Sequence, residues 1–177
     1  MTYLLILLVV IAVAVLIMFV MGYNKVRGAD IRVDEALGGI DVQLTRRASL
    51  IPGLVNTVQA FAAHEKSILD NVTAAQAALT SATTGKSVEQ RSAAEKQMDN
   101  AVGRVLALGN MYPDLKSSAN FLDLQQNLAD TEDKLAFARQ YYNDAVATCN
   151  RVVTTIPWMF MAGAAGVGQR EYYKVPQ

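Results

Sequence analysis

The chain of 177 residues carries 16 basic and 16 acidic side chains and has no formal net charge. This balance argues against the strongly basic surface that nucleic-acid binding requires, so no nucleic-acid partner is expected. A single cysteine cannot form an internal disulfide, and the small aromatic fraction of 7% favours helices over a β-rich fold. Beyond a membrane segment, the length suffices for one domain with one core.

The first predicted element is an uncharged, almost wholly apolar run over residues 2–22. At 1.5 Å per residue such a helix spans roughly 30 Å, the hydrocarbon thickness of one bilayer. A cleaved signal peptide would need a basic head, a shorter apolar core and a small-residue cleavage site, which the sequence lacks. We therefore expect a transmembrane anchor over residues 1–24. Lys25 and Arg27 follow it, and the positive-inside rule then places the rest of the chain in the cytoplasm.

The second element is a long run of heptads. Apolar residues recur at alternating steps of four and three from Val33 to Leu79, and only Arg47 and Glu65 interrupt them. This spacing is typical of a helix face buried against other helices, as in a coiled coil. The phase continues through Pro52, which removes one helical hydrogen bond, so the chain is expected either to kink or to reverse there.

Two further helical runs follow. Ser87 and Gln90 form a capping-box pattern at the start of the second run, which must stop before Pro113. The third run alternates from Phe121 to Ile156 with Thr131 as its one polar position. With Asn120 as a candidate cap, its length is roughly 36 residues, or about 55 Å.

These runs predict an all-α protein, with an N-terminal transmembrane helix followed by an antiparallel bundle of three to four long helices over residues 25–157. A kink at Pro52 gives three helices. A reversal there gives four antiparallel segments, which we favour, and brings the end of the third run beside the membrane. Residues 158–177 form an apolar, Gly/Ala-rich tail. Its candidate interaction residues, which would suit a membrane interface, the end of the bundle or a neighbouring subunit, are Trp158, Met159, Phe160 and Met161.

Arg47 and Glu65 occupy seam positions, where an unpaired charge is unfavourable. We expect them to pair with each other across a bend at Pro52, or with Arg139, Asn143 and Asp144 of the third run. The predicted buried polar layer, which would fix helix register or alternatively serve as a ligand or signalling site, comprises Arg47, Glu65, Arg139, Asn143 and Asp144.

Catalytic patterns are weak. His64 and Glu65 lack the second histidine that a zinc peptidase needs, and one histidine in the whole chain cannot build a histidine-rich metal site. A nucleophilic pair of Cys149 and His64 is the remaining alternative, although Cys149 falls on the apolar seam, where a thiolate is disfavoured. We therefore predict no enzyme activity, metal or cofactor.

The order of these features resembles the LemA family. The motifs that carry the resemblance are Tyr23-Asn24, Ile40-Asp41-Val42-Gln43-Leu44, Arg46-Arg47, Leu50-Ile51-Pro52-Gly53-Leu54-Val55, Ala63-His64-Glu65, Tyr112-Pro113-Asp114-Leu115-Lys116, Asn120-Phe121, Leu124-Gln125, Thr131-Glu132, Phe137-Ala138-Arg139, Tyr142-Asn143-Asp144-Ala145-Val146 and Asn150. The resemblance implies a single-pass protein of the bacterial inner membrane with a cytoplasmic helical domain. It implies no reaction, and it suggests a membrane-organising role through relatives in magnetosome-forming bacteria.

The leading hypothesis is a non-enzymatic, membrane-anchored scaffold. Its expected partners are the lipid bilayer, further copies of the chain and an unidentified membrane or cytoplasmic protein. Two alternatives are a signalling module that transmits a membrane state through the kink at Pro52, and a hydrolase or redox protein that uses Cys149 and His64.

Overall fold

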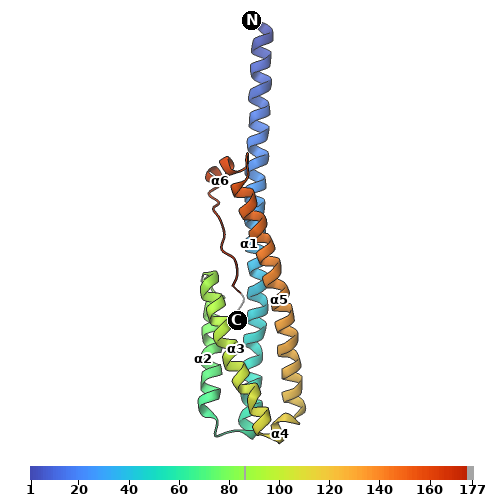
Figure 1. The fold of residues 1–177 in the computed structure, drawn as a ribbon, viewed down its shortest axis with the longest axis vertical. Helices are drawn as coiled ribbons and strands as arrows, with labels where there is room; N and C mark the ends of the chain where they lie inside the picture. Colours follow the sequence, from blue (N-terminus) through green and yellow to red (C-terminus); the bar gives the residue numbers. More distant parts are fainter. Residues whose placement is uncertain (86, 175–177) are drawn as a thin grey trace. The chain divides into compact units, whose positions relative to one another are not determined.

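The computed structural model describes residues 1–85 and 87–174, and these residues form six helices and no strand (Figure 1). The helices are α1 (Thr2–Phe61), α2 (Lys66–Ala82), α3 (Val88–Met111), α4 (Pro113–Lys116), α5 (Ala119–Thr154) and α6 (Met159–Ala165). The prediction of an all-α protein with a long apolar N-terminal helix is confirmed. The chain divides into two compact units, of which the first comprises residues 1–36 and 142–171 and the second comprises residues 37–141 and those from 172 onward.

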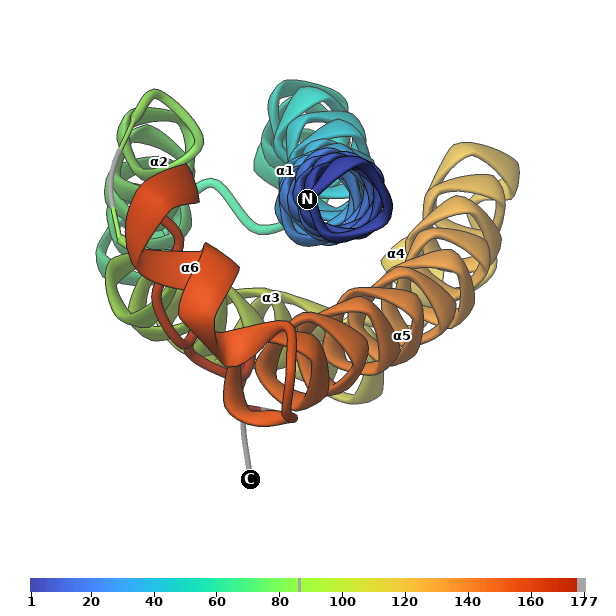
Figure 2. The same ribbon diagram turned by 90° about the horizontal axis from the view of Figure 1, so that it is seen from above.

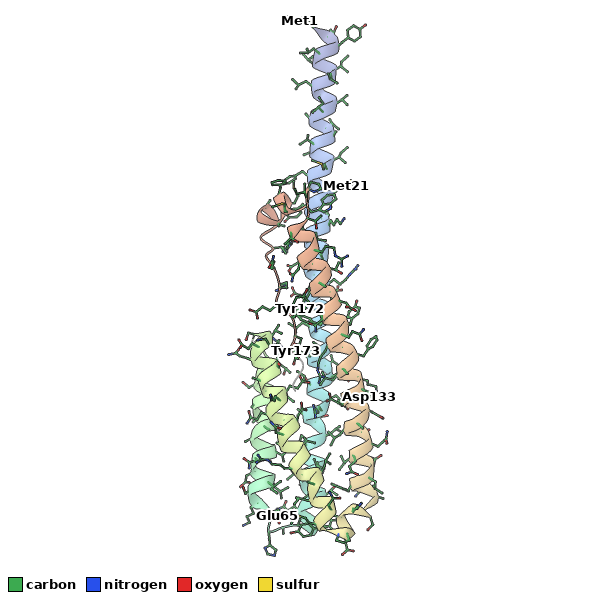
Figure 3. The ribbon with its side chains drawn as sticks, viewed as in Figure 1. Met1, Met21, Glu65, Asp133, Tyr172 and Tyr173 are labelled. Carbon is green, nitrogen blue, oxygen red and sulfur yellow. The ribbon has the colours of Figure 1, made fainter. Side chains whose placement is uncertain are left out.

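In the first unit, the apolar start of α1 makes no packing contact that buries it. Every residue from 1 to 21 is exposed, and Gly22 is the first buried position. By length and composition this part of α1 could cross a membrane. The short helix α6 lies beside α1 where the exposed run ends, and Met21 is level with it (Figure 3). Gly166 ends α6 with a φ of 66°, a left-handed conformation that glycine adopts without strain.

The second unit contains four antiparallel helical segments, namely residues 37–61 of α1, α2, α3 and residues 119–141 of α5 (Figures 1 and 2). The predicted seams supply its core. Their buried members in this unit include Ile40, Leu44, Ile51, Leu54, Val58, Val72, Leu79, Met98, Val105, Phe121, Leu128 and Leu135. The apolar faces of the four segments therefore meet each other, as the heptad spacing predicted.

The chain does not reverse at Pro52, so the favoured position of the turn was wrong. Pro52 lies inside α1, and the reversal occurs ten residues later, between Phe61 and Lys66. The seam fails at this turn, because Phe61 is 43% exposed and neighbouring Ala62 is buried instead. The turn contains neither glycine nor proline, and the heptad phase resumes in α2, which is why the pattern concealed it.

The other helix ends agree with the sequence in most respects. Ser87 and Gln90 form the predicted capping box at the start of α3. Helix α5 has the expected 36 residues, although it begins at Ala119 and Asn120 lies within its first turn rather than at the cap. In the predicted tail, residues 159–165 form α6, and residues 175–177 lie outside the described residues.

Candidate functional site

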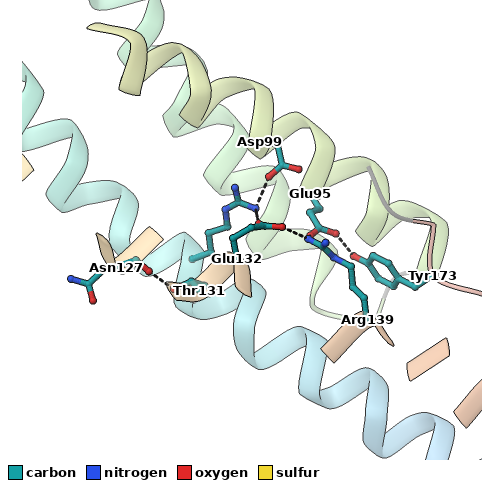
Figure 4. Close-up of polar contacts among 8 residues, drawn as sticks. Glu95, Asp99, Asn127, Thr131, Glu132, Arg139 and Tyr173 are labelled. Carbon is teal, nitrogen blue, oxygen red and sulfur yellow. Dashed lines mark hydrogen bonds and ion pairs between the residues drawn. The ribbon is translucent and has the colours of Figure 1, made fainter. Parts of the chain in front are cut away.

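Five charged side chains from three helices meet inside the second unit (Figure 4). Arg47 of α1 donates from Nη1 to Glu132 Oε2 of α5 at 2.9 Å and lies 2.5 Å from Asp99 Oδ1 of α3. Arg139, two turns after Glu132 on α5, donates to the other Glu132 oxygen at 2.9 Å and also pairs with Glu95 of α3. Glu132 thus bridges two arginines, and each arginine binds a second carboxylate from α3. We refer to these five residues as the charge network.

Tyr173, near the end of the described chain, extends the charge network. Its hydroxyl donates to Glu95 Oε2 at 2.8 Å, so both oxygens of the Glu95 carboxylate are bound. Ser92, one turn earlier on α3, donates its hydroxyl to the Lys174 carbonyl at 2.8 Å. Glu95 is 0% and Tyr173 2% exposed. The last described residues are therefore fixed to α3 by a buried side chain and a backbone contact.

Burial dominates the electrostatics of the two α3 carboxylates of the charge network. Desolvation raises the pKa of Glu95 above its ordinary 4.5, against the opposing effects of Tyr173 and Arg139. Desolvation likewise raises the pKa of Asp99, and it raises that of the Tyr173 phenol together with the charge of Glu95. Glu95, Asp99 and the Tyr173 phenol are thus each harder to ionise than they would be in water. Such a network fixes how α1, α3 and α5 pack.

A second ion pair joins α1 and α3 in the same unit. Arg91 Nε donates to Asp41 Oδ1 at 2.7 Å and Arg91 Nη2 to Asp41 Oδ2 at 3.1 Å. This is the two-point geometry in which a guanidinium binds a carboxylate most strongly. Arg91 is only 6% exposed, so the pair is shielded from solvent.

The structure brings together only part of the predicted polar layer. Arg47 and Arg139 belong to one network, but their carboxylate partners are not those expected. Glu65 lies at the turn before α2, where it accepts a hydrogen bond from the Tyr112 hydroxyl at 3.0 Å (Figure 3). Asn143 is half-buried and Asp144 exposed, both in the first unit. The pairing of Arg47 with Glu65 across Pro52 was therefore wrong, since α1 does not bend back there.

The sequence contained a signal for some of the missed residues. Extending the α3 seam backwards from Met98 by steps of three and four reaches Glu95 and Arg91, two charges at core positions. The argument that singled out Arg47 would have identified both of them. Asp99 and Glu132 flank seam positions and carry no such mark, and nothing in the sequence links Tyr173 to Glu95.

Pro52 is accommodated by a contact from another helix. A residue at position 52 with an N–H group would donate to the Ala48 carbonyl, but proline has no such group. Instead, the Gln76 side chain of α2 donates to the Ala48 oxygen at 3.0 Å. The carbonyl left without a helical donor is therefore satisfied across the interface between α1 and α2, and α1 continues through the proline.

In the first unit, the segment after α6 is held by Asp30 and Asp34 of α1 and by Asn150 near the end of α5. Arg170 pairs with Asp34 and lies 2.9 Å from Asp30, both on α1. Its backbone N–H donates to Asn150 Oδ1 at 2.7 Å, and its carbonyl accepts from Asn150 Nδ2 at 3.0 Å. The Asn150 side-chain amide therefore satisfies both the backbone N–H and the backbone carbonyl of Arg170. This double hydrogen bond accounts for an asparagine at this half-buried position on α5.

The four candidate interaction residues of the tail divide between two sides of α6. Trp158 and Met161 are half-buried, whereas Met159 and Phe160 are 42% and 67% exposed. Trp158 and Met161 pack against Gly22. A Cβ atom at position 22 would lie 2.8 Å from Met161 Cγ and 3.1 Å from the Trp158 ring, so there is no room for a side chain. Lys25 Nζ lies 4.5 Å from the centre of that ring, a cation–π contact.

The residues of the catalytic alternative lie in different environments. Cys149 is 0% exposed on α5, and burial, followed by the charge of Asp30, raises the pKa of its thiol. A thiol in this state is a poor nucleophile. His64 is exposed in the turn between α1 and α2. Among the described residues, no three His, Cys, Asp or Glu side chains are placed to hold a metal ion.

Two comparisons place the chain among known proteins. The sequence model of the LemA family matches residues 36–177. The chain is also 34% identical over 74 residues to the magnetosome protein MamQ of Magnetospirillum gryphiswaldense, a stretch covering 42% of this chain and 27% of that protein. It is 33% identical over 75 residues to MamQ 2 and to MamQ 1 of Paramagnetospirillum magneticum, over 42% of this chain and 28% of each relative. The aligned stretch thus spans little more than a quarter of the curated relatives.

Proposed function

The chain belongs to the LemA family, and on this premise we propose that it is a non-enzymatic, membrane-anchored helical scaffold that works by binding proteins, including further copies of itself. In this proposal residues 1–24 form the anchor and residues 25–157 the helical domain. Residues of the charge network and of the seams hold the helices of the second unit in one arrangement, which leaves the outer surface of that unit for recognition.

The observation that carries the proposal is an exposed aromatic pair on α5. Phe137 and Tyr141 are 72% and 52% exposed and lie four residues apart, which places them on the same helix face. Both belong to the second unit, in which the inward faces of the helices already fill the core. Aromatic side chains are enriched at protein interfaces because they bury much area at small entropic cost. We infer that this face of α5 binds another protein chain.

The membrane part of the proposal rests on the start of α1. Twenty-one exposed residues without a charge precede Lys25 and Arg27. The positive-inside rule supports a cytoplasmic helical domain, and we propose the bacterial inner membrane as the site of the anchor. The relatives are called magnetosome proteins, and we propose for this chain a role in organising the membrane that it is anchored in.

Site-specific photocrosslinking in intact bacterial membranes tests the proposal. A benzophenone amino acid replaces Phe137 in the full-length chain, and the membranes are irradiated before solubilisation. We expect crosslinked species that contain two copies of the chain or one copy with a second protein. Mass spectrometry of these species identifies the partner.

The control places the same crosslinker at Lys96, an exposed position on α3. The Lys96 variant should give markedly less crosslinked product, because lysine is depleted at protein interfaces and this face of α3 is expected to stay in solvent. Recovery of monomer alone from the Phe137 variant, at expression levels matching the native protein, would contradict the proposal.

A further inference from the structure

Residues 155–158, which link α5 to α6, and the first turn of α6 form one segment that presents apolar side chains outward. Ile156 is 70% exposed, Met159 42% and Phe160 67%, and we call these three residues the outer patch. They lie within five residues of one another, and no charged residue occurs between Ile156 and Phe160. The segment belongs to the first unit, like the start of α1.

The segment is seated against α1 through a different set of side chains. Trp158 and Met161 lie over Gly22, where any side chain would displace them, and Lys25 lies over the Trp158 ring at 4.5 Å. Ala162 and Ala165 of α6 are buried as well. The inner side of the segment is thus committed to α1, so that the outer patch faces away from the protein.

The position of this seat on α1 determines what the outer patch meets. All residues from 1 to 21 are exposed and uncharged, Gly22 is the first buried residue, and Lys25 carries the first side-chain charge. A helix that crosses a bilayer with residues 2–21 leaves the hydrocarbon at Gly22 and reaches the phosphate level near Lys25. Trp158, which touches both of these residues, therefore lies at the depth that tryptophan prefers in membranes.

We propose that Ile156, Met159 and Phe160 insert into the interfacial layer of the bilayer that α1 crosses, as a second attachment to the same membrane. The segment that carries the outer patch is seated on α1 at Gly22, where the exposed apolar run ends, and the basic side chains Lys25 and Arg27 nearby on α1 match the phosphates of an anionic leaflet. This inference rests on the membrane anchoring in the proposed function. It adds that the end of α5 is tied to the lipid surface rather than extending freely from it.

The chain contains one tryptophan, which makes the test specific. In a Trp158→Phe background, Phe160→Trp moves the only tryptophan to the outer patch. The full-length protein is reconstituted into phosphatidylcholine–phosphatidylglycerol vesicles whose acyl chains are brominated either near the headgroup or near the chain end. We expect a blue-shifted emission, strong quenching by bromine near the headgroup and weaker quenching by bromine near the chain end.

A matched control carries the reporter on an equally exposed apolar residue of the second unit, Met111 at the end of α3, which is 68% exposed. Met111→Trp in the same Trp158→Phe background is expected to keep a water-like emission that neither lipid quenches. Circular dichroism verifies that the native protein and the two double variants have the same helix content. Flotation of the vesicles on a density gradient reports separately whether α1 is inserted.

These measurements distinguish the inference from its premise. Flotation with an unquenched tryptophan at position 160 leaves the anchor intact and overturns the interfacial attachment. A blue-shifted emission that ignores bromine but depends on the protein-to-lipid ratio also overturns it, because the outer patch would then contact a second copy of the chain. Failure of flotation contradicts the anchor itself.

Discussion

Charged side chains lie inside the second unit of the chain, whereas apolar side chains lie on the outside of the first. In the second unit, Glu95 and Arg139 are almost fully buried, and each has an oppositely charged partner. In the first unit, the apolar residues of α1 before Gly22 are exposed all round. The two units thus depart from the usual distribution of side chains in opposite directions.

The difference shows that buried charges and exposed apolar side chains are stabilised in different ways. A buried charge loses its hydration, and only a partner inside the protein can replace it. An exposed apolar helix needs no partner inside the protein, because a surrounding apolar phase can cover it. The buried charges Glu95 and Arg139 of the second unit are therefore paired inside the protein, while the apolar surface of the first suits lipid outside the chain.

The largest expected effect follows from removing one charge of the network. In Arg139→Met, Glu95 keeps its hydrogen bond to Tyr173 but loses its cationic partner. Leaving a buried charge without its ion-pair partner typically costs about 3–5 kcal/mol. We expect the unfolding free energy of the full-length protein in detergent micelles to fall by roughly this amount, measured by urea titration with circular dichroism.

The matched control is Lys134→Met, which removes an exposed cation from the same helix. It should change the unfolding free energy by no more than about 0.5 kcal/mol. Equal stabilities of the two variants would show that the pairing of Glu95 with Arg139 contributes nothing to the second unit.

A smaller, pH-dependent effect is expected for Glu95→Gln. Desolvation raises the pKa of Glu95 above 4.5 in the folded protein, so the folded state binds its proton more tightly than the unfolded chain. The stabilising contribution of that proton is fully present below 4.5 and is lost as the pH rises through the raised pKa. The native protein should therefore be most favoured over the variant at low pH and lose ground as the pH increases. Urea titrations of both proteins across this range test the sign, and a difference that grows in the opposite direction would contradict the assignment.

A still smaller effect concerns the contact that accommodates Pro52 in the second unit. Gln76→Met removes the donor to the Ala48 carbonyl and should lower stability by about 1 kcal/mol. Pro52→Ala restores a backbone N–H that can donate to the same oxygen. In the double variant the loss caused by Gln76→Met should therefore shrink, which a double-mutant cycle measures directly. Additive effects would show that Gln76 does not compensate for the proline.

Much of the fold follows from the sequence because heptads record which helix face is buried. The seam residues Ile40, Leu44 and Ile51 lie in the core, and the capping box at Ser87 begins α3 as predicted. The turn at residues 62–65 could not be placed. Its residues are common in helices, and the phase on both sides matches, whereas the conspicuous Pro52 lies on an exposed face that tolerates it.

The candidate sites were less predictable, because periodicity identifies a buried charge without identifying its partner. Arg47 was found on its seam, but Asp99 and Glu132 lie beside their seams and are selected only by three-dimensional proximity. Tyr173 illustrates the limit, since it reaches Glu95 from 78 positions away in the sequence. The seat of Trp158 on Gly22 was equally hidden, because a glycine in an apolar run gives no sign that another segment packs on it.

The smallest expected effect sharpens the comparison at the boundary between the two environments, where Lys25 lies over Trp158. A cation–π contact at an exposed site is worth about 0.5–1 kcal/mol, so Lys25→Met should loosen the seat of α6 without unfolding the protein. Trp158 should become more accessible to acrylamide in micelles, whereas Lys25→Arg, which keeps the cation, should leave the quenching near the native level. If acrylamide quenches the Trp158 fluorescence of both variants to the same extent as in the native protein, packing against Gly22 alone holds the tryptophan. The charge of Lys25 would then act on the orientation of the anchor in the membrane and not on the packing of Trp158.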